Sequence, residues 1–109
     1  MRPDPVLSML GLAAKAGKIV SGEFATEQAI KADKACLVVI AKDASDNTTK
    51  KFMDACTYHH LPVISYADKD SLGSCIGKDY RSSLAVVDEK LAAAVRKKYD
   101  STIRNMEVD

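Results

Sequence analysis

The stretch Cys36-Leu37-Val38-Val39-Ile40-Ala41 decides the fold, because it is an unbroken run of apolar, mostly β-prone residues. A strand with one face in water alternates apolar and polar residues, whereas a continuously apolar strand is typical of burial on both faces. Other elements must then cover both of its faces. The run therefore predicts a central strand in a layered α/β fold.

Helix-like and strand-like segments alternate on both sides of this central run. Further strands are expected at 19–20, 61–66 and 83–87. Helical spacing predicts a first helix that Gly17 ends in a left-handed conformation, and a second helix over 23 to about 32 with Ser21 as its N-cap. The fold class predicted is α/β, a three-layer α/β/α sandwich around a four-stranded mixed sheet, with one domain over residues 1–109.

Three more helices complete the expected order. The third has its N-cap candidates in 43–46 and one face formed by Thr49, Phe52, Met53 and Cys56. The fourth is a short helix closed by Gly77. The last helix runs from about Asp88, with an apolar stripe that includes Leu91 and Val95.

Composition places the chain among ordinary globular proteins and excludes several classes. The 109 residues are 47% hydrophobic and 28% charged, and no apolar run approaches the ~18 residues of a membrane span. An odd number of cysteines without a CxxC pair, and an N-terminus without an apolar signal segment, predict a cytoplasmic protein. A net charge of only +1 argues against a protein that coats nucleic acid non-specifically.

The enzyme hypothesis is weak. Gly73, Gly77 and Lys78 resemble a phosphate-binding loop superficially, but they end a helix instead of opening one. Cys56, His59 and His60 could bind a metal, yet a fourth ligand is missing, so a buried Cys with two surface histidines is the simpler interpretation. We expect no catalytic residue, no metal and no cofactor.

Two loops carry residues that suit nucleic acid. The Gly17–Gly22 segment brings a helix start with small residues near Lys15, Lys18 and Lys31, which could contact phosphates. The loop at 77–82 combines the cations Lys78 and Arg81 with Tyr80, an aromatic that could stack on an unpaired base. Each segment taken alone is more often an ordinary charged turn. The cluster at 96–98 is most simply a solvated helix face, with RNA or a protein partner as the alternative.

Several stretches together resemble the kink-turn-binding ribosomal proteins, and the bacterial YlxQ-like branch is the nearest. The stretches are LGLAAKAGKIVSG at 10–22, VIAKDASDNT at 39–48, and shorter matches at 61–63, 72–73 and 76–81. The resemblance implies an α/β/α sandwich, no catalysis, and binding to kinked or looped RNA. Its partners would be structured RNA, ribosomal RNA and ribosomal proteins among them, with no membrane.

The resemblance also implies which residues contact RNA. They lie at the start of the second helix and in the loop before the last strand: Lys18, Gly22, Glu23, Phe24, Gln28, Lys78, Tyr80 and Arg81. Family members that read kink-turns carry an Asn-Glu pair and a Lys at the positions of Phe24, Ala25 and Gln28. This departure weakens the expected base contacts, and we expect Phe24 to be packed. A module of the same fold that acts through protein contacts is the alternative function.

Overall fold

Nine elements alternate along the part of the chain that the computed structural model describes, residues 3–107. Their order confirms the expected alternation of helices and strands. The elements are α1 Pro5–Lys15, β1 Ile19–Ser21, α2 Glu23–Lys31, β2 Leu37–Ile40, α3 Asp46–His59, β3 Val63–Ser65, α4 Lys69–Cys75, β4 Ser83–Val86 and α5 Glu89–Glu107.

The four strands form one mixed sheet in the order β1-β4-β2-β3. Strand β2 is parallel to β3 and antiparallel to β4, and β4 is antiparallel to β1. All residues of β2 are buried, as the apolar run at 36–41 predicted, and all residues of β4 are buried as well. Because β4 runs against the other three strands, the C-terminal ends of β1, β2 and β3 and the start of β4 share one edge of the sheet, called here the carboxyl edge.

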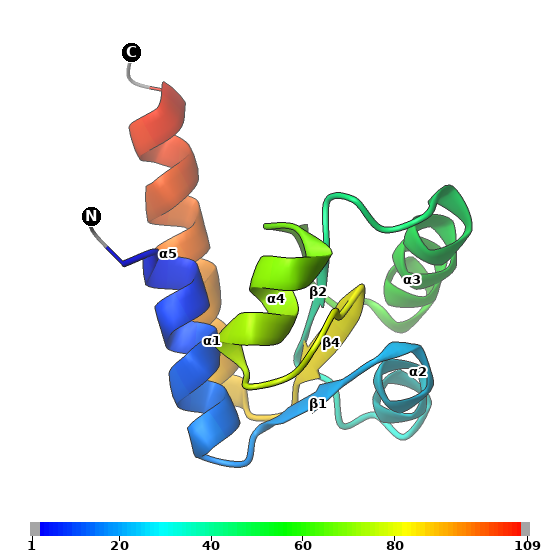
Figure 1. Ribbon diagram of the computed structural model, residues 1–109. Coiled ribbons are helices and arrows are strands. Elements are labelled where there is room, and N and C mark those ends of the chain that lie inside the picture. Colours follow the sequence, from blue (N-terminus) through cyan, green and yellow to red (C-terminus); the bar gives the residue numbers. More distant parts are fainter. Residues whose placement is uncertain (1–2, 108–109) are drawn as a thin grey trace.

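Helices cover both faces of the sheet, which confirms the three-layer sandwich. Figure 1 shows α1, α4 and α5 on one face and α2 and α3 on the other. Successive side chains of β2 point to opposite faces of the sheet and so contribute to both cores. Leu37 and Val39 belong to the core under α1 and α5, whereas Val38 and Ile40 pack with Phe52 on the opposite side. A strand that serves two cores has no polar face, which explains its composition.

Side-chain caps fix where four helices begin, and at α5 the Asp88 carboxylate accepts from the Leu91 N–H over 2.9 Å. Asp4 accepts hydrogen bonds from the backbone N–H groups of Val6 and Leu7 at the start of α1, and the Tyr66 hydroxyl donates to it over 2.6 Å. Ser45 caps α3 and is one of the candidates predicted within 43–46. Asp68 caps α4, and the hydrogen bonds from Ser71 lower the pKa of this carboxyl.

Two local predictions were wrong. Ser21 is not the N-cap of α2 but the last residue of β1, and Gly22 occupies the cap position with a φ of 95° and no side-chain cap. Met53 does not face the core and is 44% exposed. The buried stripe of α3 is narrow and consists of Phe52 and Cys56 alone. Gly17, in contrast, has the predicted left-handed conformation, with a φ of 73°.

Candidate functional site

Three chain segments meet at the carboxyl edge next to β4. The N–H of Gly22 donates to the carbonyl of Ser83 over 3.0 Å, and the N–H of Ala41 donates to the carbonyl of Ser82 over 2.9 Å. The start of α2, the segment after β2 and the loop before β4 are therefore neighbours. Residues from three distant parts of the sequence form one surface.

The start of α2 presents bare backbone donors at this surface. The first N–H groups of any helix lack intrahelical acceptors, and within residues 3–107 no other acceptor is bonded to the N–H groups of residues 23–25. Gly22 adds no side chain, and its φ of 95° is a conformation that L-residues rarely adopt. An anionic group can therefore approach these donors closely, and the helix dipole favours a negative charge there.

Arg81 joins the loop before β4 to the end of β1. Its Nε donates to the Ser21 Oγ over 3.0 Å, and its Nη1 donates to the carbonyl of Tyr80 over 2.9 Å. These bonds hold a half-buried guanidinium beside the residue that precedes Gly22. Such a fixed planar donor suits a phosphate oxygen.

Buried Gly73 in α4 supports the same loop. The N–H of Lys78 donates to the Gly73 carbonyl over 2.9 Å, and the N–H of Arg81 donates to the Lys69 carbonyl over 3.1 Å. An ideal Cβ built on Gly73 would lie 1.6 Å from the carbonyl oxygen of Asp79. The loop can adopt this path only because position 73 has no side chain.

Two aromatic side chains in these segments are exposed. Phe24 is 76% exposed and Tyr80 is 70% exposed, so the expectation that Phe24 is packed was wrong. Helix α2 turns Thr26, Ala29 and Ile30 towards the sheet, which leaves Phe24 on its outer flank. There it lines a mostly apolar surface hollow of about 540 Å³, together with Val20, Ala25, Gln28, Ala29, Ala32, Lys34 and Val87. An exposed ring of this kind is available for stacking.

The acidic residues of α2 are paired with lysines. Lys51 of α3 lies 2.5 Å from Glu27 and 3.4 Å from Glu23, and Lys31 lies 3.3 Å from Glu27. Hydrogen bonds from Lys51 and Lys31 lower the pKa of Glu27. These pairs reduce the negative charge beside the start of α2 and tie this helix to α3.

The structure brings only part of the predicted residue set together. Gly22, Glu23, Phe24, Lys78, Tyr80 and Arg81 lie in the segments that meet at the carboxyl edge, and Gln28 lies about one turn further along α2. Lys15 and Lys18 precede β1 and lie at the opposite edge of the sheet, where Lys18 pairs through its carbonyl with Val87. Lys31 lies in the last turn of α2, about 13 Å along the helix from Gly22.

Lys42 belongs to this surface but was not among the predicted contacts. It follows β2 directly, its side chain is exposed, and its N–H donates to the Ala67 carbonyl over 2.7 Å. Its Nζ lies 5.9 Å from the centroid of the Tyr66 ring. The available signal was its position immediately after the buried strand, where the chain must leave the sheet.

The described residues offer little to an enzyme mechanism. Between residues 3 and 107 no group of three or more His, Cys, Asp or Glu side chains could hold a metal ion. Burial raises the pKa of the Cys56 thiol to about 11, so this sulfur stays protonated near neutral pH and is a poor nucleophile. In the same range of residues, no helix combines the length and apolarity needed to cross a bilayer.

Known proteins resemble this chain in sequence and in fold. Residues 4–96 match the model of the ribosomal protein L7Ae/L30e/S12e/Gadd45 family. The RNA-binding protein YlxQ of Bacillus subtilis (strain 168) is 42% identical over 77% of this chain and 84% of its own. The RNA-binding protein YlxQ of Enterococcus faecium is 36% identical over 79% of this chain and 82% of its own.

Two solved structures share the fold. A protein of unknown function from Bacillus halodurans C has a TM-score of 0.87 at 32% identity and covers 90% of this chain and 99% of its own. The Giardia lamblia 15.5kD RNA binding protein has a TM-score of 0.77 at 20% identity and covers 89% of this chain and 83% of its own.

Proposed function

The chain belongs to the ribosomal protein L7Ae/L30e/S12e/Gadd45 family, and from this membership we propose that it is a non-catalytic protein that binds structured RNA at the carboxyl edge. Two relatives that bear the name RNA-binding protein support RNA as the partner. The RNA we propose is kinked or looped, with ribosomal RNA as the first candidate and association with ribosomes as the setting. The whole chain would act as one RNA-binding domain.

The observation that carries this proposal is the bond between Arg81 and Ser21. It holds a guanidinium beside the backbone N–H groups at the start of α2, which are unpaired within residues 3–107. Two kinds of hydrogen-bond donor that can bind a phosphate therefore face one surface. A chain with a net charge of +1 cannot rely on general attraction to a polyanion. Local donors of fixed geometry instead favour recognition of a particular backbone shape.

Stacking would supply the base contacts that this surface otherwise lacks. At the positions where related RNA binders carry Asn, Glu and Lys, this chain carries Phe24, Ala25 and Gln28. Two aromatic rings are exposed close to Arg81 in the sequence or to its partner Ser21: Tyr80 precedes Arg81 in the loop, and Phe24 lies three residues after Ser21, at the start of α2. An unpaired base can stack on either ring with little regard for its identity. We therefore propose recognition by shape and stacking, with phosphate contacts from Lys42, Lys78 and Arg81.

One observation favours a second candidate function, in which the chain acts through protein contacts. The hollow beside Phe24 is mostly apolar, and an exposed aromatic next to an apolar hollow also suits a protein partner. The salt dependence of the binding affinity distinguishes the two functions. Contacts with phosphates weaken steeply as salt rises, whereas burial of an apolar anchor does not.

Replacing Phe24 with alanine is expected to weaken binding of a short kink-turn RNA about tenfold, because base–aromatic stacking contributes ~1–3 kcal/mol. Fluorescence anisotropy of a labelled RNA measures the change. The unfolding midpoint should stay near that of the wild type, since Phe24 is largely exposed. Phe24→Tyr keeps the ring and should bind as the wild type does.

A matched control comes from Tyr58, an aromatic residue of α3 that is 81% exposed. Tyr58→Ala removes a similar ring from a different part of the surface and should leave RNA affinity unchanged. Equal affinity of the Phe24→Ala variant and the wild type would count against stacking at the start of α2.

A further inference from the structure

Positive charge is concentrated in the body of α5, between the acids Glu89 and Glu107 at its two ends, and the whole helix carries a net charge of +2. Residues 90–106 contain five cations, Lys90, Arg96, Lys97, Lys98 and Arg104, and one acid, Asp100. The net charge of this segment is therefore +4. Because the net charge of the whole chain is +1, the remaining residues together carry −3. The segment is far more basic than the chain as a whole.

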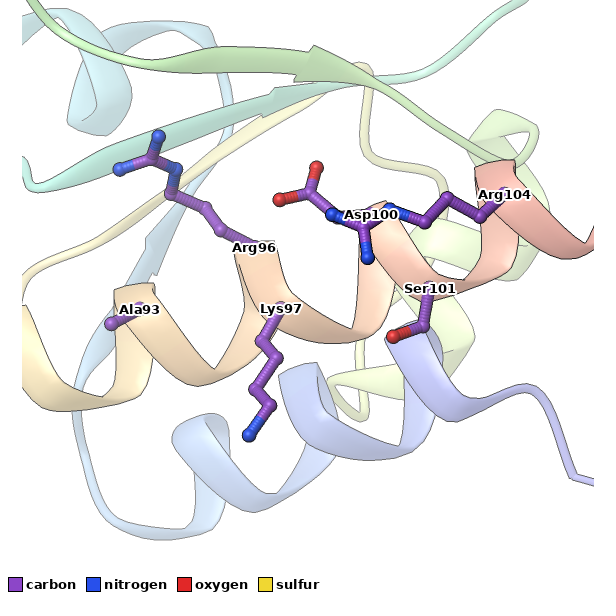
Figure 2. Close-up of a pocket in the computed structure, with 6 residues that line it drawn as sticks. All are labelled: Ala93, Arg96, Lys97, Asp100, Ser101 and Arg104. Carbon is purple, nitrogen blue, oxygen red and sulfur yellow. The ribbon is translucent and has the colours of Figure 1, made fainter.

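Helical spacing places most of this charge on the solvent face of α5. Arg96, Lys97 and Arg104 are exposed and line one shallow hollow of about 390 Å³ with Ala93, Asp100 and Ser101 (Figure 2). Ala92 and Val95 are buried on the opposite side of the helix. Arg96 and Arg104 are eight residues apart, which is about 12 Å along the helix axis. The hollow is an open cationic strip, called here the α5 strip.

The cations of the α5 strip form no ion pair with the side chains of residues 3–106, which are the ones that the structure describes. In the described part of the chain, every lysine ion pair involves Lys31, Lys50 or Lys51 of the α2–α3 layer. Among the side chains that the structure describes, those of residues 3–106, no carboxylate lies within 4.0 Å of a charged nitrogen of Arg96, Lys97 or Arg104. A run of uncompensated cations suits a polyanionic partner.

The surroundings of the α5 strip favour a nucleic-acid backbone over an acidic protein. Protein interfaces are centred on large apolar or aromatic anchors, but the other residues that line the strip are Ala93, Asp100 and Ser101, none of which is large and apolar. Contacts with phosphates need donors alone, and arginine is the residue best suited to them.

The position of α5 relates this strip to the carboxyl edge. The rings of Tyr66, just after β3, and Tyr99 of α5 lie 5.9 Å apart between centroids. The helix continues for two more turns past Tyr99, and Figure 1 shows this end projecting beyond the other elements. Arg104 thus lies past the edge that carries the candidate site, on the opposite face of the sheet.

We propose that the α5 strip contacts the phosphate backbone of a helical arm of the RNA that is held at the carboxyl edge, an inference that rests on the proposed function. Arg96, Lys97 and Arg104 each contact a phosphate, and Asp100 weakens the contact. The carboxyl edge selects the shape of the RNA, while the α5 strip adds affinity that depends on the length of the arm and not on its sequence.

The test uses two kink-turn RNAs that differ only in arm length. In one RNA the arms are longer than the 37 Å maximum extent of the protein, and in the other they are shorter than its 25 Å minimum extent. The variant Arg96→Gln/Lys97→Gln/Arg104→Gln should bind the long-arm RNA at least about tenfold more weakly at ~50 mM salt. The slope of log affinity against log salt should fall by ~2–3. Binding of the short-arm RNA should not change.

A second pair of variants tests the sign of the charge effect. Asp100→Asn removes the acid from the strip and should strengthen binding of the long-arm RNA. Asp54→Asn makes the same change in net charge on α3, where Asp54 pairs with Lys50 over 2.8 Å, and should have a much smaller effect. All these positions are exposed, so circular dichroism should show unchanged folding.

The outcomes separate this inference from the proposed function. If the triple variant binds the long-arm RNA with the same affinity and salt slope as the wild type, the α5 strip has no role in binding. An equal loss of affinity for both RNAs would also overturn that role. A wild-type protein that binds neither RNA would overturn the proposed function itself.

Discussion

Replacing Gly73 with alanine is expected to abolish RNA binding and to lower the free energy of unfolding by about 3 kcal/mol. The added Cβ would lie 1.6 Å from the carbonyl oxygen of Asp79 and 2.6 Å from its carbon, distances that no packing tolerates. The loop from Lys78 to Arg81 would have to leave α4. Arg81 would then lose its place beside Ser21. Chemical denaturation and RNA binding measure the two effects.

Gly11 provides the control for this substitution. It also lies inside a helix, but a Cβ there would lie 3.0 Å from the carbonyl oxygen of Cys75, which requires a shift of only a few tenths of an ångström. Alanine also raises helix propensity by about 1 kcal/mol over glycine. Gly11→Ala should therefore change stability by less than about 1 kcal/mol and leave RNA binding intact. If Gly11→Ala and Gly73→Ala lose stability and RNA affinity to a similar extent, the close contact between position 73 and the Asp79 carbonyl is not what the loop depends on.

Replacing Arg81 with alanine is expected to weaken RNA binding about a hundredfold, because it removes a positioned cation and the link between two segments of the site. A hydrogen bond to a charged group contributes ~1.5–3 kcal/mol, and each 1.4 kcal/mol is about tenfold in affinity. The salt slope should fall by ~1, since one phosphate contact is lost. Titrations at several salt concentrations measure both.

Two further variants separate charge from position at Arg81. Ser21→Ala keeps the guanidinium but removes the Oγ that accepts from Nε, so a loss of a few-fold is expected. Arg81→Lys keeps the charge but not the planar fork of donors, and should fall between the wild type and Arg81→Ala. Full affinity of Arg81→Ala, with folding intact, would remove Arg81 from the proposed interface.

The layered fold was predictable because its signals are local and agree with one another. The apolar run at 36–41 required cover on both faces, and helix signals on either side of it supplied that cover. The N-cap of α2 was missed because a serine next to a glycine is ambiguous by sequence. Pairing of Ser21 with Leu84 in the sheet decides that it stays in β1, and a partner so distant in sequence leaves no local signal.

The candidate site was only partly predictable. Sequence reasoning grouped Lys15 and Lys18 with Gly22, but a strand between them places the two lysines at the other edge of the sheet. The contact between Ser21 and Arg81 spans 60 positions and could not be derived from spacing. The exposure of Phe24 depends on which face α2 turns to the sheet, and an apolar ring among small residues gave no indication of it.

The measurement that tests the account most directly compares wild-type binding to a kink-turn RNA and to a straight duplex, at ~50 and ~200 mM salt. Recognition of shape by fixed donors predicts a preference for the kinked RNA that persists at the higher salt, while duplex binding nearly disappears. Equal and weak binding to both RNAs, lost together as salt rises, would contradict shape recognition at the carboxyl edge.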